Sequence, residues 1–229
     1  MRTALVVLAA GSGTRFGDAV NKVWLPLSGR RIISRSLLNA AKNFKNCRLV
    51  LVIDPKDEAL AQEVIAREVP KLDIEIVYGG LTRHGSEFNA LQHLSPAIKN
   101  GEIDVILIHD GARPLATPAL FETIATTANK HGGAIPTVKV SSFELDQHQN
   151  ENVVRVQTPQ GYQAQPLLEA YELAERDGFT GTDTGACMEK YFPNIKTIAI
   201  PADPSNVKIT YPQDLVIAEH VLQKRGYRD

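Results

Sequence analysis

A glycine-rich turn near the N-terminus has the residue types that phosphate binding needs. Residues 8–17 read LAAGSGTRFG. Glycines let the backbone approach a ligand closely, and successive amide N–H groups in such a turn attract anions. The turn lacks the Gly-Lys-Ser/Thr ending of a Walker loop, and Phe16 stands where the dinucleotide fingerprint needs glycine. A purely structural turn is the alternative, and nucleotide binding is the leading hypothesis.

Two cations near this turn favour phosphoryl or nucleotidyl transfer. Arg15 lies in the turn and Lys22 follows seven residues later. Attack on a phosphate builds negative charge on phosphorus and on the leaving pyrophosphate, which fixed cations stabilise. An isolated Lys or Arg is usually a solvated surface charge. Because this pair accompanies a glycine-rich turn, we interpret it as part of a transfer site.

Two further polar turns carry groups that suit a nucleotide. Gly79 and Gly80 permit close approach to a base, and Arg83 and Ser86 behind them offer hydrogen-bond donors. Asp110 follows another apolar run, and a carboxylate near triphosphate oxygens is a natural Mg²⁺ ligand. A turn aspartate with no metal is the alternative for Asp110. The three turns together predict one nucleotide site if the fold brings them to one place.

An α/β fold would bring the three turns to one place. Short β-branched runs alternate with helical periodicity, which is typical of parallel strands joined by crossover helices. The predicted strands are residues 5–8, 48–53, 74–78, 105–109, 134–138 and 197–200. Helical apolar spacing occurs in residues 33–41 and 60–65, and further helices are predicted to begin near Pro118, Pro166 and Pro212. We predict a Rossmann-like, open, mostly parallel sheet with helices on both faces, whose carboxyl edge collects the turns. His109 is interpreted as a packed strand residue.

One segment interrupts the alternation. Residues 139–157 are polar over most of their length and lack helical spacing, while residues 153–156 look strand-like. A hairpin arm standing off the sheet and a long surface loop both fit this pattern. We therefore predict a single domain over residues 1–229 with an arm at about residues 139–157.

Composition excludes several classes of protein. The chain has 229 residues, of which 43% are apolar and 22% are charged, so the collagen-like, disordered and disulfide-scaffold classes are excluded. Its formal charge of -1 excludes the basic surface that duplex-DNA binding needs. Cys47 and Cys187 have no metal or redox spacing and are predicted to be core thiols. No apolar run reaches the ~20 residues of a membrane helix. We expect a cytoplasmic protein without nucleic-acid or membrane partners.

With these residues in hand, the chain resembles the 2-C-methyl-D-erythritol 4-phosphate cytidylyltransferases and the related ribitol-5-phosphate cytidylyltransferases. The resemblance covers nearly the whole chain and rests on seven ordered blocks: residues 8–15, Lys22, Gly79-Gly80 with Arg83 and Ser86, HDGARP at 109–114, QTPQ at 157–160, Thr182-Asp183 and NVKIT at 206–210. It implies a Mg²⁺-dependent transfer from CTP to a polyol phosphate. It also implies a homodimer whose protruding arms exchange.

The resemblance assigns roles residue by residue. It implies that Arg15, Lys22 and Lys208 stabilise the triphosphate and its reacting α-phosphate, and that Asp110 faces the magnesium-bound triphosphate. The implied nucleotide-binding residues are Ala10, Gly11, Ser12, Gly13, Gly79, Gly80, Arg83 and Ser86. The implied acceptor-side residues are Arg113, Thr158, Thr182 and Asp183, with Lys208 assisting. The acceptor phosphate would attack CTP directly, without a covalent intermediate.

The chain also departs from this family. Asn21 and Val23 flank Lys22, where the family usually has proline and glutamine, and Leu81 stands where an acidic residue is common. The sequence VKVSS at residues 138–142 replaces the arm's Asp-Thr-Ile/Met-Lys pattern, and the arm is shorter. Asn150 stands where the family has an acceptor-binding arginine. We consider Arg155 or Lys139 as its substitute, and favour Arg155.

Three hypotheses about the function follow from these residues. The first is a CTP-dependent cytidylyltransferase acting on methylerythritol phosphate or on another polyol phosphate such as ribitol 5-phosphate. The second is a sugar-phosphate nucleotidyltransferase that uses another nucleotide, and the third is a non-catalytic nucleotide-binding protein. Arg15, Lys22, Asp110 and Lys208 together favour an enzyme, because a binding module does not need cations on both sides of the α-phosphate.

Overall fold

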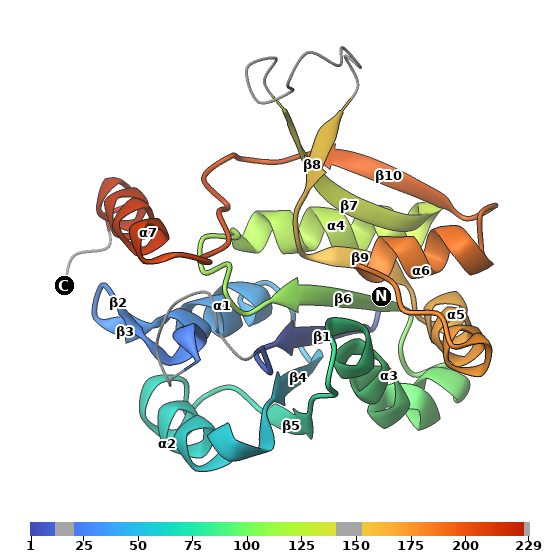
Figure 1. The fold of residues 1–229 in the computed structure, drawn as a ribbon, viewed down its shortest axis with the longest axis horizontal. Coiled ribbons are helices and arrows are strands. Elements are labelled where there is room, and N and C mark those ends of the chain that lie inside the picture. The colour runs from blue at the N-terminus through green and yellow to red at the C-terminus, as the bar shows by residue number, and fades with distance from the viewer. Residues whose placement is uncertain (12–20, 141–152, 227–229) are drawn as a thin grey trace.

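The computed structural model describes residues 1–11, 21–140 and 153–226 (Figure 1). A sheet of eight strands runs through the molecule in the order β10-β7-β9-β6-β1-β4-β5, with β8 paired to β7. Its strands are β1 (Thr3–Leu8), β4 (Arg48–Ile53), β5 (Ile74–Tyr78), β6 (Val105–Asp110), β7 (Gly132–Lys139), β8 (Val154–Val156), β9 (Gln160–Gln163) and β10 (Lys196–Pro201). All six predicted strands are therefore present, and the mostly parallel α/β sheet is confirmed.

The parallel strands bring the chemically interesting turns to one edge. β1 pairs in parallel with β4 and β6, and β4 pairs in parallel with β5. In this register Leu8 lies beside both Val52 and Asp110. The segments that follow these four strands consequently emerge together at their carboxyl ends, which is where ligands bind in open α/β sheets.

Helices cover both faces of the sheet (Figure 1). One face packs against α1 (Ile32–Ala41), α2 (Glu58–Glu68) and α4 (Pro118–His131), and the other packs against α3 (Arg83–Lys99), α5 (Ala164–Asp177) and α6 (Thr184–Tyr191). Within β1, Leu5 and Val7 belong to the first core, and Ala4 and Val6 to the second. Burial on both faces explains why β1, β4 and β6 read as continuous apolar runs.

A smaller apolar cluster fastens the C-terminal helix. Leu27 and Ile32 pack with Leu222 of α7 (Pro212–Lys224), close to the two-stranded hairpin of β2 (Pro26–Leu27) and β3 (Arg30–Arg31). Of the two cysteines, Cys187 is buried as predicted, and Cys47 is half-buried against the core. No helix in the described ranges is long and apolar enough to cross a membrane.

The strand β9 was absent from the sequence prediction. It runs antiparallel between β6 and β7, so the sheet is mixed at this side. Its sequence, Gln-Gly-Tyr-Gln, lacks the β-branched residues that mark strands. A Cβ at Gly161 would lie 2.6 Å from Leu107 Cδ2, so glycine is needed here for close packing of a helix and a neighbouring strand.

The interrupting segment begins as a hairpin. Lys139 of β7 lies opposite Val154 of β8, and Val138 lies opposite Arg155. The backbone N–H of Val140 donates to Val153 O at 3.3 Å, which continues the pairing outward. The paired strands project beyond the helices that cover the sheet (Figure 1). Residues 141–152, including Asn150, lie outside the described residues.

Candidate active site

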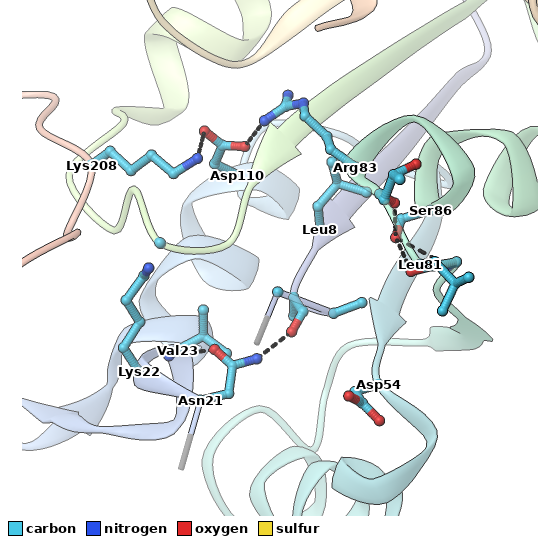
Figure 2. A pocket seen from close by; sticks show the side chains of 16 residues that line it. Leu8, Asn21, Lys22, Val23, Asp54, Leu81, Arg83, Ser86, Asp110 and Lys208 are labelled. Atoms are coloured by element: carbon cyan, nitrogen blue, oxygen red, sulfur yellow. Dashed lines mark hydrogen bonds and ion pairs between the residues drawn. The ribbon is translucent and has the colours of Figure 1, made fainter. Parts of the chain in front are cut away.

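A cavity of about 440 Å³ lies at the carboxyl ends of β1, β4, β5 and β6 (Figure 2). It is lined by segments that follow each of these strands, together with the start of α3 and residues near Lys22 and Lys208. The predicted site residues that line it are Ala10, Gly11, Lys22, Gly80, Arg83, Ser86, Asp110 and Lys208. Ser12, Gly13 and Arg15 lie outside the described residues.

Asp110 is the electrostatic centre of the cavity. Its carboxylate accepts from Lys208 Nζ at 3.0 Å and from Arg113 Nε at 3.4 Å, and forms an ion pair with Arg83. Burial by itself raises the pKa of the Asp110 carboxyl, but Arg83, Lys208 and Arg113 outweigh it and hold the pKa well below its usual range. Asp110 is therefore fully ionised at neutral pH.

A second, buried carboxylate holds Arg83 from behind. Glu87, one helical turn along α3, accepts from Arg83 Nε at 2.9 Å and from Thr184 Oγ1 at 3.2 Å, and Tyr171 OH also donates to it. Its side chain is 1% exposed. Burial raises the pKa of Glu87, partly opposed by Arg83 and Tyr171. Sequence reasoning missed Glu87, although its i,i+4 spacing from Arg83 was an available signal.

Lys22 is positioned by a short 3-10 helix, η2 (Lys22–Trp24). Asn21 caps this helix, since its Oδ1 accepts from Val23 N at 3.4 Å, and its Nδ2 donates to Ala9 O at 2.5 Å. Asn21 thereby ties the lysine segment to the end of β1. Asn21, which stands where the family that the chain resembles usually has proline, therefore anchors the lysine segment. The sequence alone did not predict this role.

Of the glycine pair, Gly80 lines the cavity and Gly79 packs behind it. The N–H of Gly79 donates to Ile53 O at 2.8 Å, and the N–H of Gly80 donates to Ser86 Oγ at 3.2 Å. A Cβ added at Gly79 would come within 2.4 Å of Ala10 Cβ. Gly79 is therefore needed so that the segments after β1 and β5 can touch, although it does not itself line the cavity.

Arg113 and Thr158 lie behind Asp110 and outside the cavity lining. The N–H of Asp110 donates to Thr158 Oγ1 at 3.0 Å, and Arg113 Nη1 donates to Asn206 O at 2.8 Å. His109 Nδ1 lies 3.1 Å from Thr158 Oγ1, and burial lowers the pKa of His109 to about 3. A neutral, buried imidazole agrees with its interpretation as a packed residue.

The remaining predicted acceptor residues lie outside this cavity. Asp183 caps α6, accepting from Ala186 N at 2.9 Å, and also accepts from Gln160 Nε2 at 2.9 Å. Thr182 beside it is exposed, and Arg155 lies on the exposed strand β8. Within the described residues, most of the nucleotide-side residues therefore line the cavity, whereas Thr182, Asp183 and Arg155 do not.

The carboxylates of the cavity limit how a metal could bind. Its lining contains Asp54 and Asp110, and no cluster of three His, Cys, Asp or Glu ligands occurs in the described part of the chain. Mg²⁺ is commonly held by one or two carboxylates together with substrate phosphates. The ionised Asp110 therefore fits Mg²⁺ that arrives with a nucleotide, and the site does not form an all-protein cage.

The open parallel sheet and the cation-lined cavity at its carboxyl edge define an α/β nucleotidyltransferase. The family model for 2-C-methyl-D-erythritol 4-phosphate cytidylyltransferase matches residues 3–224, and the chain belongs to that family.

Individual relatives agree with this assignment. The 2-C-methyl-D-erythritol 4-phosphate cytidylyltransferase of Geobacillus kaustophilus is 33% identical over 233 residues, covering 98% of this chain and 99% of the relative. The crystal structure of 4-diphosphocytidyl-2C-methyl-D-erythritol synthase from Anaerococcus prevotii has a TM-score of 0.78 at 26% identity, covering 97% and 96% of the two chains. The Thermus thermophilus cytidylyltransferase has a TM-score of 0.71 at 25% identity, covering 95% and 98%.

Proposed function

We propose that this chain transfers a cytidylyl group from CTP to 2-C-methyl-D-erythritol 4-phosphate and releases pyrophosphate, a step in the synthesis of isoprenoid precursors. The proposal rests on the cavity at the strand ends, which Lys22, Lys208 and the ionised Asp110 line together. Family membership supplies the identity of the two substrates.

The reaction is a direct displacement. An oxygen of the acceptor's phosphate attacks the α-phosphorus of CTP and forms a new P–O bond, while the bond to the β-phosphate breaks and pyrophosphate leaves. Lys22, Lys208 and Arg15 stabilise the negative charge that builds on the α-phosphate and on the leaving group. Lys208 also pairs with Asp110, so its ammonium is already oriented in the cavity before the nucleotide binds. Catalysis is then positioning and electrostatic stabilisation.

The nucleotide and acceptor sides divide the remaining residues. Ala10, Gly11, Ser12 and Gly13 bind the nucleotide, as do Gly79, Gly80, Arg83 and Ser86. Support for this side comes from the close packing of Gly79 against Ala10 and from the bond between Gly80 and Ser86. The acceptor side consists of Arg113, Thr158, Thr182, Asp183 and Arg155.

Mg²⁺ is the proposed cofactor, and Asp110 is the residue that would hold it together with the triphosphate. When bound, it would neutralise charge on the phosphate oxygens. Lys208, half-exposed at the cavity, would face the phosphates, and Arg83 and Arg113 hold the carboxylate of Asp110 in place.

We further propose a cytoplasmic homodimer of single-domain chains, with the arm of residues 139–157 reaching the partner's acceptor site. Arg155 and Thr182 lie apart from the cavity of their own chain, as residues that complete a partner's site would. Val154 and Val156 give β8 exposed apolar side chains that contact with a second copy would cover.

The proposal is tested by incubating the protein with CTP, Mg²⁺ and methylerythritol phosphate and identifying the product by mass. We expect a cytidine diphosphate adduct of methylerythritol and one pyrophosphate for each adduct. The Lys208→Ala variant should lose most of this activity, while Lys130→Ala, an exposed lysine at the end of α4, should retain it. Release of pyrophosphate without the adduct would refute the proposed transfer.

A further inference from the structure

The candidate cavity has two electrostatically different ends (Figure 2). Lys22 and Lys208 lie at one end with Asp110, and Asp54 lies at the other beside Leu81 and Ser86. A triphosphate is drawn toward the two lysines, whereas the charge of Asp54 is offset by Lys56 and gives its end of the cavity no net attraction for phosphate. The Asp54 end is consequently left for the base and ribose of a bound nucleotide.

Asp54 lines the cavity near the glycine pair. It directly follows β4, whose last residue, Ile53, accepts from Gly79 N at 2.8 Å. Asp54 Oδ1 accepts from Lys56 N at 3.1 Å, which caps the short helix η3 (Pro55–Asp57), and Asp54 Oδ2 pairs with Lys56 Nζ at 3.1 Å. These bonds fix the carboxylate at the cavity.

The carboxylate keeps capacity for a ligand. An ionised carboxylate offers about four lone-pair sites, and the two contacts with Lys56 leave part of that capacity available. The hydrogen bond from the backbone of Lys56 lowers the pKa of Asp54, so the group is ionised at neutral pH and only accepts hydrogen bonds. Its side chain is 30% exposed. A ligand group facing Asp54 must therefore be a donor.

We propose that Asp54 selects the nucleobase by accepting a hydrogen bond from the exocyclic amino group of cytosine. Uracil presents a carbonyl oxygen in place of that amino group, and an oxygen facing a carboxylate is repelled. Leu81, fully exposed at the same end, adds no polar partner there. Asp54 is then a specificity residue, distinct from the groups that stabilise the reacting phosphate.

This inference rests on the proposed function, since it assumes that the cavity holds a cytidine nucleotide. The test is a calorimetric measurement of CTP and UTP binding, with Mg²⁺ present, to the full-length wild-type protein and to the Asp54→Asn variant. Asparagine preserves the cap on η3 because its side-chain oxygen still accepts from Lys56 N, and its amide nitrogen can donate to uracil. Asp73→Asn, an exposed residue before β5, removes the same charge away from the cavity.

We expect Asp54→Asn to weaken CTP binding by about 10-fold or more, the typical effect of losing a hydrogen bond to a charged group, and to leave UTP binding unchanged or tighter. Asp73→Asn should leave the CTP-to-UTP ratio at the wild-type value. An equal change for both nucleotides, a larger loss for UTP, or no change would overturn the assignment of Asp54. Failure of the wild-type protein to bind CTP would refute the proposed function and this inference, whereas an altered ratio without cytidylyl transfer would refute the function alone.

Discussion

Replacing Asp110 with asparagine removes the charge on which the cavity's cations converge. Three side chains lose an anionic partner: Lys208, Arg83 and Arg113. They differ in exposure, with Lys208 39% exposed, Arg83 26% and Arg113 12%. Asparagine has nearly the same shape as aspartate but only one accepting oxygen, whereas both oxygens of Asp110 accept from these cations, so the change removes the charge and at least one accepted bond.

These exposures determine how much free energy of unfolding the Asp110→Asn variant loses. Removing one partner of a buried ion pair typically costs about 3–5 kcal/mol, because the other charge is left uncompensated. The pair with Lys208 is discounted to less than ~1 kcal/mol because solvent screens it. Arg83 keeps its bond to Glu87, so Arg113 bears most of the loss. We therefore expect the free energy of unfolding to fall by about 3 kcal/mol, the low end of the range.

Urea unfolding at neutral pH measures this change. Asp203→Asn is the control, because Asp203 is 64% exposed and lies 3.8 Å from Arg225, and its removal should cost less than ~1 kcal/mol. The pH dependence has a definite sign. The pKa of Asp110 is lowered in the folded state, so its contribution is complete above its ordinary pKa of 3.8 and is lost as pH falls further. A loss at neutral pH no larger than that of the control would show that the ion pairs of Asp110 do not stabilise the fold.

Four further changes test other parts of the site. Glu87→Gln should lower the free energy of unfolding by about 2 kcal/mol and raise the KM for CTP, because glutamine has one accepting oxygen where the two of Glu87 face Arg83, Thr184 and Tyr171; unchanged urea unfolding would contradict this. Gly79→Ala should lower the free energy of unfolding by about 1–3 kcal/mol, since the new Cβ would lie 2.4 Å from Ala10 Cβ. Thermal unfolding would measure this loss. Lys22→Ala should depress kcat on the order of 10²-fold with a smaller change in KM, whereas a change in KM alone would assign the lysine to ground-state binding. Arg155→Ala should raise the KM for the acceptor and leave the KM for CTP nearly unchanged in steady-state assays, and an unaltered acceptor KM would remove Arg155 from the acceptor site.

The sequence was sufficient to predict the sheet because its strands have a simple physical signature. β1, β4 and β6 are buried along nearly their whole length, so they read as apolar β-branched runs, and amphipathic helices separate them in the sequence. β9 escaped prediction because its glycine and glutamines are favoured by packing against Leu107 and by neighbours far away in the chain. Local propensity does not contain that information.

Contacts between residues far apart in the chain also limited the prediction of the candidate site. The turns after β1, β5 and β6 were predictable, because the end of a parallel strand is a fixed place in the fold. The i,i+4 spacing could have paired Glu87 with Arg83, but its burial was not predictable, since a glutamate on a helix is ordinarily solvated. Its burial depends on Tyr171 and Thr184, which the sequence places more than 80 residues away. Asp183 likewise was predicted from a motif, and its capping bond to Ala186 became visible only in three dimensions.

A competition between two acceptors tests whether this chain transfers the cytidylyl group to methylerythritol phosphate. Equal concentrations of methylerythritol phosphate and ribitol 5-phosphate are supplied in one reaction with limiting CTP and Mg²⁺, and the two cytidine diphosphate products are quantified by mass. The product ratio reports the ratio of the two kcat/KM values. We predict that the methylerythritol product predominates. Predominance of the ribitol product would contradict the assigned acceptor, and the absence of both products would contradict cytidylyl transfer itself.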